Sequence, residues 1–110
     1  MDREEFHEHL TENVEQDLEV LKKKNQDYSR GEDPFQNFRQ VEEKGLVSVE
    51  EGIAVRMSDK FQRMVNLIES GERAVEDESL SDTLSDLRNY SNILQVYIEH
   101  EKPGQDPSVS

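Results

Sequence analysis

Apolar residues recur at three- and four-residue steps along most of this chain, and that spacing predicts helices. Between residues 3 and 24 the apolar side chains fall on one stripe, formed by Phe6, Leu10, Val14, Leu18 and Leu21. Three lysines, at positions 22–24, follow the stripe, and the helix dipole favours cations in a last turn. We therefore predict a helix over residues 3–24. The next stretch, 25–33, has no periodicity and is rich in turn-forming residues, so it predicts a loop.

Capping signals predict a second and a third helix. The Asp33-Pro34 pair is typical of a helix start, with aspartate as the N-cap and proline at the first helical position. Gly45 would end this short helix. Ser48-x-x-Glu51 is a capping box, which predicts a third helix that begins at residue 49 and ends before Ser70-Gly71.

A fourth helix is predicted from Asp77 or Glu78 to about residue 101. Its core face is apolar and is formed by Leu80, Leu84, Leu87, Leu94 and Ile98. Residues 102–110 lack this periodicity and predict a disordered tail. Because no stretch alternates as a strand would, we predict an all-α protein, a bundle of four to five helices in a single domain over residues 1–101.

Composition adds expectations about partners. Of the 110 residues only 32% are hydrophobic and 6% aromatic, so the core is small and a homo-oligomer, a dimer or larger, is expected. The net charge of −13 argues against a DNA-binding surface, which needs basic residues. Such acidity is typical of a well-solvated surface and equally of proteins from high-salt organisms.

Other sequence features bear on location. The chain contains no cysteine, so neither a disulfide framework nor thiol chemistry is expected. Its first residues do not resemble a signal peptide, and no apolar run reaches membrane length. We expect a cytoplasmic protein that does not associate with a membrane.

The charged residues of the third and fourth helices lie beside the predicted core rather than on the water-facing side. Successive residues are about 100° apart around a helix. On the third helix this places an apolar arc at Ile53, Met57, Phe61, Met64 and Ile68. It is bordered by what we call the basic arc: Arg56, Asp59, Lys60 and Arg63. On the fourth helix the acidic arc contains Glu78, Asp82, Asp86 and Asn89. One or two turns later Ile93 and Val96 point the same way, so we expect a neighbouring helix to cover this side.

Two interpretations account for a basic arc near an acidic arc. Buried carboxylates need cations or a metal ion, because an uncompensated buried charge is costly. The arcs could therefore form a lattice of salt bridges between helices. Alternatively, they could form a Mg²⁺ site, because magnesium binds a few carboxylates together with phosphate oxygens, and neighbouring cations neutralise phosphate charge.

Four blocks of sequence, in this order, resemble the nucleotide modification associated domain 1 family. The blocks are Lys24-Asn25-x-Asp27-Tyr28, then Asn37-Phe38, then Gly52-Ile53-x-x-Arg56-x-x-Asp59-Lys60-x-x-Arg63, and finally Asp77-Glu78-Ser79-x-x-Asp82-Thr83-Leu84-x-Asp86-Leu87-x-Asn89-Tyr90. They span about residues 20–98. The family consists of small all-α proteins that are frequent in bacteriophages, archaeal viruses and prophages. The last block is also distantly similar to the acidic helix of MazG-like and dimeric dUTPase-like nucleotide pyrophosphohydrolases.

This resemblance implies the all-α nucleotide pyrophosphatase fold and a Mg²⁺-dependent nucleotide-binding protein of viral or prophage type. The more distant similarity implies a nucleoside triphosphate pyrophosphohydrolase. Those enzymes carry a Glu-x-x-Glu helix, where the third helix of this chain has Asp59 between basic residues. Nucleotide binding is therefore the firmer expectation, and turnover the further hypothesis.

Roles follow for individual residues. The metal would be held by Glu78, Asp82, Asp86 and Asp59, with Asp82 and Asp86 also as the catalytic carboxylates. Phosphates would contact Arg56, Lys60 and Arg63. The base or sugar would contact Asn25, Asp27, Tyr28 and Asn89. Two other functions fit the same residues: a protein that sequesters nucleotides without turnover, and a purely structural helical oligomer held by the salt-bridge lattice.

Overall fold

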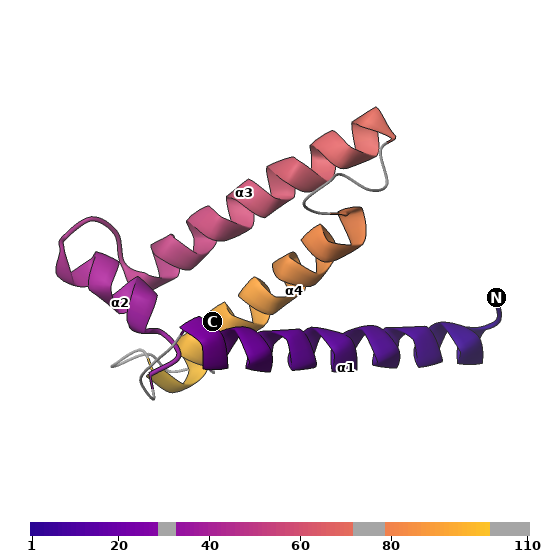
Figure 1. Ribbon diagram of the computed structural model, residues 1–110, viewed down its shortest axis with the longest axis horizontal. Coiled ribbons are helices and arrows are strands. Elements are labelled where there is room, and N and C mark those ends of the chain that lie inside the picture. Colours follow the sequence, from indigo (N-terminus) through magenta and orange to yellow (C-terminus); the bar gives the residue numbers. More distant parts are fainter. Residues whose placement is uncertain (29–32, 72–78, 102–110) are drawn as a thin grey trace. The chain divides into compact units, whose positions relative to one another are not determined.

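The computed structural model describes residues 1–28, 33–71 and 79–101, and for residues 25–28 it describes the backbone only. Within these ranges the regular elements are helices (Figure 1). They are α1 (Arg3–Tyr28), α2 (Gln36–Glu43), α3 (Val49–Ser70), α4 (Leu80–Val96) and the π-helix η1 (Tyr97–Glu101). The predicted all-α class is confirmed. The tail predicted over 102–110 lies outside the described residues.

The chain divides into two compact units, Met1–Pro34 and Phe35–Ser110, which are described separately. In the first unit, α1 runs four residues beyond the predicted end at residue 24. Asp2 caps its start, since Asp2 Oδ1 accepts a 2.8 Å hydrogen bond from the backbone N–H of Glu5. The apolar residues of the predicted stripe lie on this helix. Whether residues 1–101 form one domain stays a prediction.

Helix α2 begins at Gln36, two residues later than predicted. Its N-cap is Phe35, whose side chain is buried and meets the Tyr97 ring edge-on, with 5.3 Å between ring centroids. The chain therefore turns at Pro34 and Phe35 to bring this ring into the core, and a distant contact overrides the local start signal. The predicted end is confirmed, because Gly45 follows the C-cap Lys44 with φ +74°.

Helix α3 begins at the predicted residue, Val49, and ends at Ser70, one residue later than predicted. Ser48 Oγ accepts from the N–H of Glu51, and Glu51 Oε1 accepts from the N–H of Ser48, both at 3.1 Å. Glu42 of α2 adds a third acceptor, its Oε2 lying 2.9 Å from the N–H of Val49. Gly71 ends the helix with φ +71°. Helix ends that are capped by neighbouring residues are the ends that sequence signals predict best.

Helix α4 begins at Leu80, later than the predicted start at Asp77 or Glu78. The helix start is set by Ser79, which forms a capping box with Asp82: Ser79 Oγ accepts from the N–H of Asp82 at 3.1 Å, and Asp82 Oδ2 accepts from the N–H of Ser79 at 3.3 Å. The sequence signal for this start is Ser-x-x-Asp before an apolar run, and its aspartate also belongs to the acidic arc. After Val96 the chain continues as the π-helix η1.

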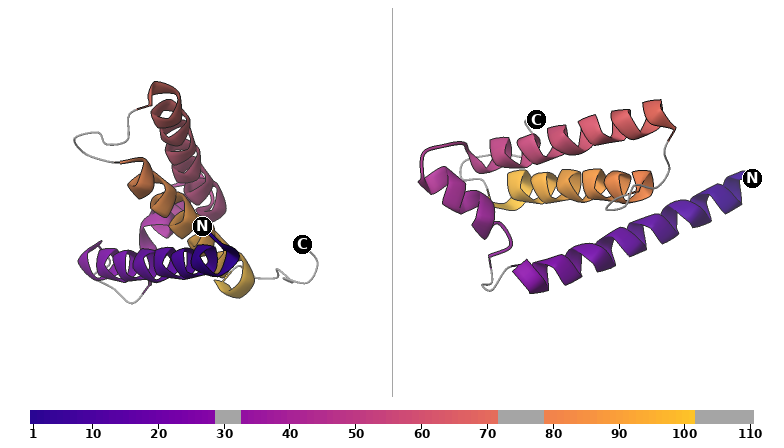
Figure 2. Two further views of the ribbon diagram at one scale, coloured as in Figure 1. Left: turned by 90° about the vertical axis from the view of Figure 1, so that its right-hand side faces the viewer. Right: turned by 45° about the horizontal axis from the view of Figure 1, so that its top comes forward.

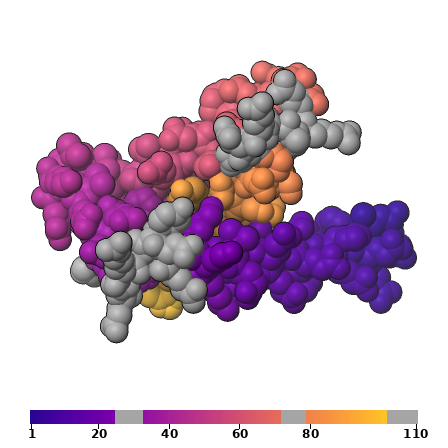
Figure 3. Space-filling view, in the orientation of Figure 1, coloured from indigo at the N-terminus to yellow at the C-terminus, as the bar shows by residue number. Residues whose placement is uncertain are grey.

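The core of the second unit lies where α2, α3, α4 and η1 meet. Its buried members are Phe35, Val49, Ile53 and Tyr97, and half-buried residues pack against them: Phe38, Met57, Tyr90, Ile93 and Leu94. Helices α3 and α4 run side by side (Figure 2), and their side chains are in contact in the space-filling view (Figure 3). Helix α2 crosses α3 near Gly52, where a Cβ atom would lie 3.3 Å from the Phe38 ring. Among the described helices, none is both long and apolar enough to span a membrane.

Candidate functional site

The buried side of α3 is turned toward the basic arc. Ile53 is fully buried, and Met57 and Met64 are half-buried, as their place in the apolar arc predicts. For Phe61 and Ile68, from the other edge of that arc, the predicted core position is wrong, because they are 57% and 59% exposed. The side of α3 that packs therefore points between Val49, Ile53 and Leu67, which is the direction of Lys60.

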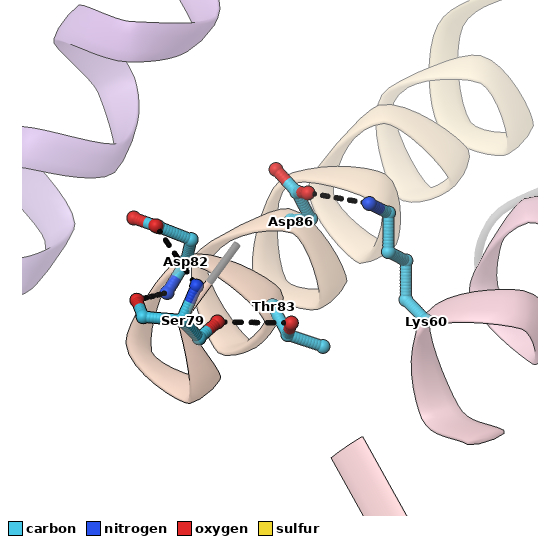
Figure 4. Close-up of polar contacts among 5 residues, drawn as sticks. All are labelled: Lys60, Ser79, Asp82, Thr83 and Asp86. Atoms are coloured by element: carbon cyan, nitrogen blue, oxygen red, sulfur yellow. Dashed lines mark hydrogen bonds and ion pairs between the residues drawn. The ribbon is translucent and has the colours of Figure 1, made fainter. Parts of the chain in front are cut away.

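Lys60 reaches across the contact between α3 and α4 and pairs with Asp86. Its Nζ atom lies 2.9 Å from Asp86 Oδ2, and the two side chains are 25% and 17% exposed. Figure 4 shows Lys60 approaching from α3 and the carboxylate of Asp86 projecting from α4 to meet it. The basic and acidic arcs thus meet at this pair. Because both groups are largely removed from water, the pairing matters more here than at an exposed surface.

Asp82 caps the start of helix α4. It is exposed, and one carboxylate oxygen accepts the Ser79 N–H in the capping box described above. In Figure 4 its carboxylate projects from the turn of α4 before that of Asp86 and lies farther from Lys60. Thr83, in the first turn of α4, is fully buried, and its Oγ1 donates a 3.1 Å hydrogen bond to the carbonyl of Ser79. The start of α4 is therefore fixed by contacts among three neighbouring residues.

The other residues of the basic and acidic arcs differ in how exposed they are. On α3, Arg63 is half-buried, whereas Arg56 and Asp59 are exposed. On α4, Asn89 is buried, at 7% exposure. The acidic arc is thus covered at Asn89 and Asp86 and open at Asp82. Glu78 lies outside the described residues, as do the side chains of Asn25, Asp27 and Tyr28, so the roles assigned to these four residues stay predictions.

The described residues supply part of what a magnesium ion requires. Within the described ranges, no group of three or more His, Asp or Glu side chains is arranged to hold a metal ion. Magnesium in nucleotide sites often takes only one or two carboxylates, with water and phosphate oxygens completing its shell. Asp82 and Asp86 are one helical turn apart on α4 and supply that donor chemistry. They fit a site that the phosphate of a ligand completes, rather than a metal cage made by protein alone.

A second charged cluster, which the sequence did not single out, lies at the other end of the unit. The Arg39 guanidinium carbon is 5.7 Å from the centre of the Phe35 ring and 5.6 Å from that of Tyr97. Its Nη2 atom also lies 3.4 Å from Glu101 Oε2. The four-residue spacing of Phe35 and Arg39 could have predicted their stacking. The contacts of Arg39 with η1 could not be predicted in this way, because η1 is distant in sequence. The cluster ties α2 to the end of the chain's last described helix.

At the start of α3, hydrogen bonding changes the acidity of one carboxyl group. The backbone N–H of Ser48, and then its hydroxyl, hold the pKa of Glu51 below its ordinary value. These bonds favour the ionised form, and the helix N-terminus favours a negative charge as well.

Comparisons of the chain with protein-family models, with characterised proteins and with solved structures found no match.

Proposed function

We propose that this protein binds the phosphate chain of a nucleotide together with Mg²⁺, at the place where the basic arc of α3 meets the acidic arc of α4. The observation that carries the proposal is the Lys60–Asp86 pair at 2.9 Å. It supplies, from two helices and at one point, a cation for phosphate and a carboxylate for metal. The resemblance to the nucleotide modification associated domain 1 family supports the same ligand class.

Binding would proceed by an exchange of partners. A phosphate oxygen would take Lys60 away from Asp86, because a multiply charged phosphate attracts an ammonium group more strongly than one carboxylate does. Asp86 would then join Asp82, one turn earlier on α4, as a metal ligand. Arg56 and Arg63 would neutralise further phosphate charge from the same arc. The bound ion would supply Lewis-acid polarisation of the phosphate and would activate a water molecule if the nucleotide is hydrolysed.

The test is a panel of nucleoside mono-, di- and triphosphates, with and without Mg²⁺, in which the thermal midpoint and the products are both measured. We expect a nucleotide to raise the midpoint, and Mg²⁺ to increase that rise. Any hydrolysis should appear as Mg²⁺-dependent release of pyrophosphate. The panel is run at low and at high salt because the chain carries a net charge of −13. The proposal fails if no nucleotide shifts the midpoint under any of these conditions.

A matched pair of variants separates metal binding from helix capping at Asp82. Asp82→Asn keeps an oxygen that can accept the Ser79 N–H but removes the charge that a metal needs. It should lose the Mg²⁺-dependent part of the stabilisation while the protein stays folded. Glu69→Gln removes an exposed acid from α3 outside both arcs and should leave nucleotide binding unchanged. If Asp82→Asn binds nucleotide and Mg²⁺ like the wild type, Asp82 is a cap only.

A second function is favoured by the same pair: a structural helical protein in which Lys60–Asp86 belongs to a salt-bridge lattice. Under this alternative no nucleotide stabilises the protein, and removal of either partner lowers stability. A third result, stabilisation by nucleotide without any product, would indicate sequestration without turnover.

A further inference from the structure

Both carboxylates of the proposed metal site are engaged by the protein itself. Asp86 Oδ2 lies 2.9 Å from the ammonium nitrogen of Lys60, and Asp82 Oδ2 accepts the backbone N–H of Ser79. Figure 4 shows the two carboxylates on neighbouring turns of α4, with Lys60 next to Asp86. The side chains of this ion pair are only 25% and 17% exposed. Lys60 therefore stands where a metal ion on Asp86 would need to be the positive partner.

The ammonium group of Lys60 opposes metal binding at Asp86. Mg²⁺ binds carboxylate oxygens at about 2.1 Å, so an ion on Asp86 Oδ2 would have this ammonium group beside it. Like charges that are so close repel each other strongly where water is largely excluded. Asp82 alone offers one exposed carboxylate, which is a poor site for an ion that gives up its water reluctantly. Among the residues that the structure describes, no group of three or more His, Asp or Glu side chains offers an alternative.

We propose that Lys60 blocks Mg²⁺ binding at Asp86 until a phosphate group pairs with the lysine. This inference rests on the proposed function, because it concerns the regulation of the same site. The phosphate group would remove the repelling cation from Asp86 and would add oxygen ligands for the ion. Phosphate and Mg²⁺ should therefore bind cooperatively, and by thermodynamic linkage each should raise the affinity for the other by the same factor. The metal would then bind only with its ligand, although the net charge of −13 attracts cations.

Titration with Mg²⁺ alone, without any nucleotide, tests the block. Binding is followed by calorimetry and by the thermal midpoint of unfolding. Wild type should bind weakly, and Lys60→Met should bind about tenfold more tightly, because Asp86 has lost the competing cation. Lys60→Arg keeps a cation beside Asp86 and should behave like the wild type. Lys44→Met removes the same charge from an exposed position outside both arcs and should leave the affinity unchanged.

A double variant assigns the gain in Mg²⁺ affinity to one carboxylate. Lys60→Met combined with Asp86→Asn should return the affinity to the wild-type level, because the carboxylate that Lys60→Met releases is no longer charged. The proposal is overturned if Lys60→Met binds Mg²⁺ no better than Lys44→Met does, or if the gain persists in the double variant.

Inorganic phosphate tests the block in the unaltered protein, so the answer does not depend on whether Lys60→Met folds. The Mg²⁺ titration of wild type is repeated with inorganic phosphate present, and the association of phosphate with Mg²⁺ in solution is measured separately and corrected for. We expect phosphate to raise the Mg²⁺ affinity by about fivefold or more. A Mg²⁺ affinity of wild type that phosphate does not change overturns the proposal.

The nucleotide panel described above decides the proposed function separately. If nucleotides raise the midpoint but Mg²⁺ binds wild type and Lys60→Met equally, the proposed function stands and the block by Lys60 is wrong. If both titrations show the block but no nucleotide raises the midpoint, the site takes metal and phosphate without a nucleotide, and the proposed function is wrong.

Discussion

Lys60 is the residue on which both interpretations of the charged arcs depend. In the sequence it is one of three cations at helical spacing, and its direction between Ile53 and Leu67 predicts that its base lies against the core. In the structure it points along the buried side of α3 and meets Asp86, whereas Arg56 is exposed. The sequence could predict that the two arcs face each other, because both border the core. It could not predict which cation pairs with which acid, since that depends on how the two helices are rotated against each other.

A double-mutant cycle measures what this pair contributes to stability. Lys60→Met leaves the largely buried Asp86 carboxylate without its ion pair to Lys60, and we expect unfolding free energy to fall by about 1–3 kcal/mol. Adding Asp86→Leu removes the remaining charge, so the double variant should recover most of the loss. Urea unfolding of the four proteins gives the coupling energy.

The exposed Arg56 provides the control for that cycle. Arg56→Met should change the free energy of unfolding by no more than about 0.5 kcal/mol, as for most surface substitutions. If the double variant is stable but no nucleotide stabilises it, Lys60 and Asp86 act in binding as well as in folding. A coupling energy near zero would show that the pair between Lys60 and Asp86 does not contribute to stability.

At the scale of the element, local sequence signals predict the helix ends that neighbouring residues cap, but not the ends that distant contacts decide. Both ends of α3 were predictable because its caps use neighbouring residues, Ser48 with Glu51 at the start and Gly71 at the end. The start of α2 was not, because burial of Phe35 against Tyr97 decides it. For α4, Ser79-x-x-Asp82 is a capping signal, but Asp82 also fits the acidic arc that predicts a metal site. An acidic residue three positions after a serine can cap a helix or bind a metal ion, and the sequence alone does not distinguish the two roles.

The start of α3 should make stability depend on pH in a way that can be traced to one group. Because hydrogen bonds from Ser48 lower the pKa of Glu51 in the folded state, the ionised carboxylate stabilises the fold. This contribution is fully present above the pKa of the unfolded state, and it is lost as the pH falls through the lower folded pKa. Glu51→Gln retains an oxygen acceptor but cannot ionise.

The stability difference between wild type and Glu51→Gln should therefore be largest near neutral pH and shrink on acidification. Urea unfolding of both proteins between pH 7 and pH 3 measures it, and the acids common to both cancel in the difference. Glu43→Gln, on the exposed side of α2, is the control and should not reproduce this dependence. A difference that stays constant over the whole range would contradict a role for the ionised Glu51.

At the scale of the whole molecule, the dominant physical fact is the net charge of −13 on 110 residues. Composition predicted this acidity to be either a means of staying in solution or an adaptation to high salt, and the fold does not alter that choice. Many acidic side chains repel one another in the compact state, where they are closer together than in the unfolded chain. Screening shortens the reach of this repulsion from about 10 Å at 0.1 M salt to about 3 Å at 1 M.

We therefore expect the thermal midpoint to rise as NaCl is increased from 0.1 M to 1 M, by several degrees in a chain of this size. The pair between Lys60 and Asp86 opposes the trend only weakly, since it is partly shielded from solvent and its two atoms are 2.9 Å apart. Sucrose, which raises stability without screening charge, separates a charge effect from general exclusion of solute from the surface. A midpoint that is unchanged or lower at 1 M NaCl would mean that attractive ion pairs balance or outweigh the repulsion. The salt-bridge lattice would then extend beyond the pair between Lys60 and Asp86.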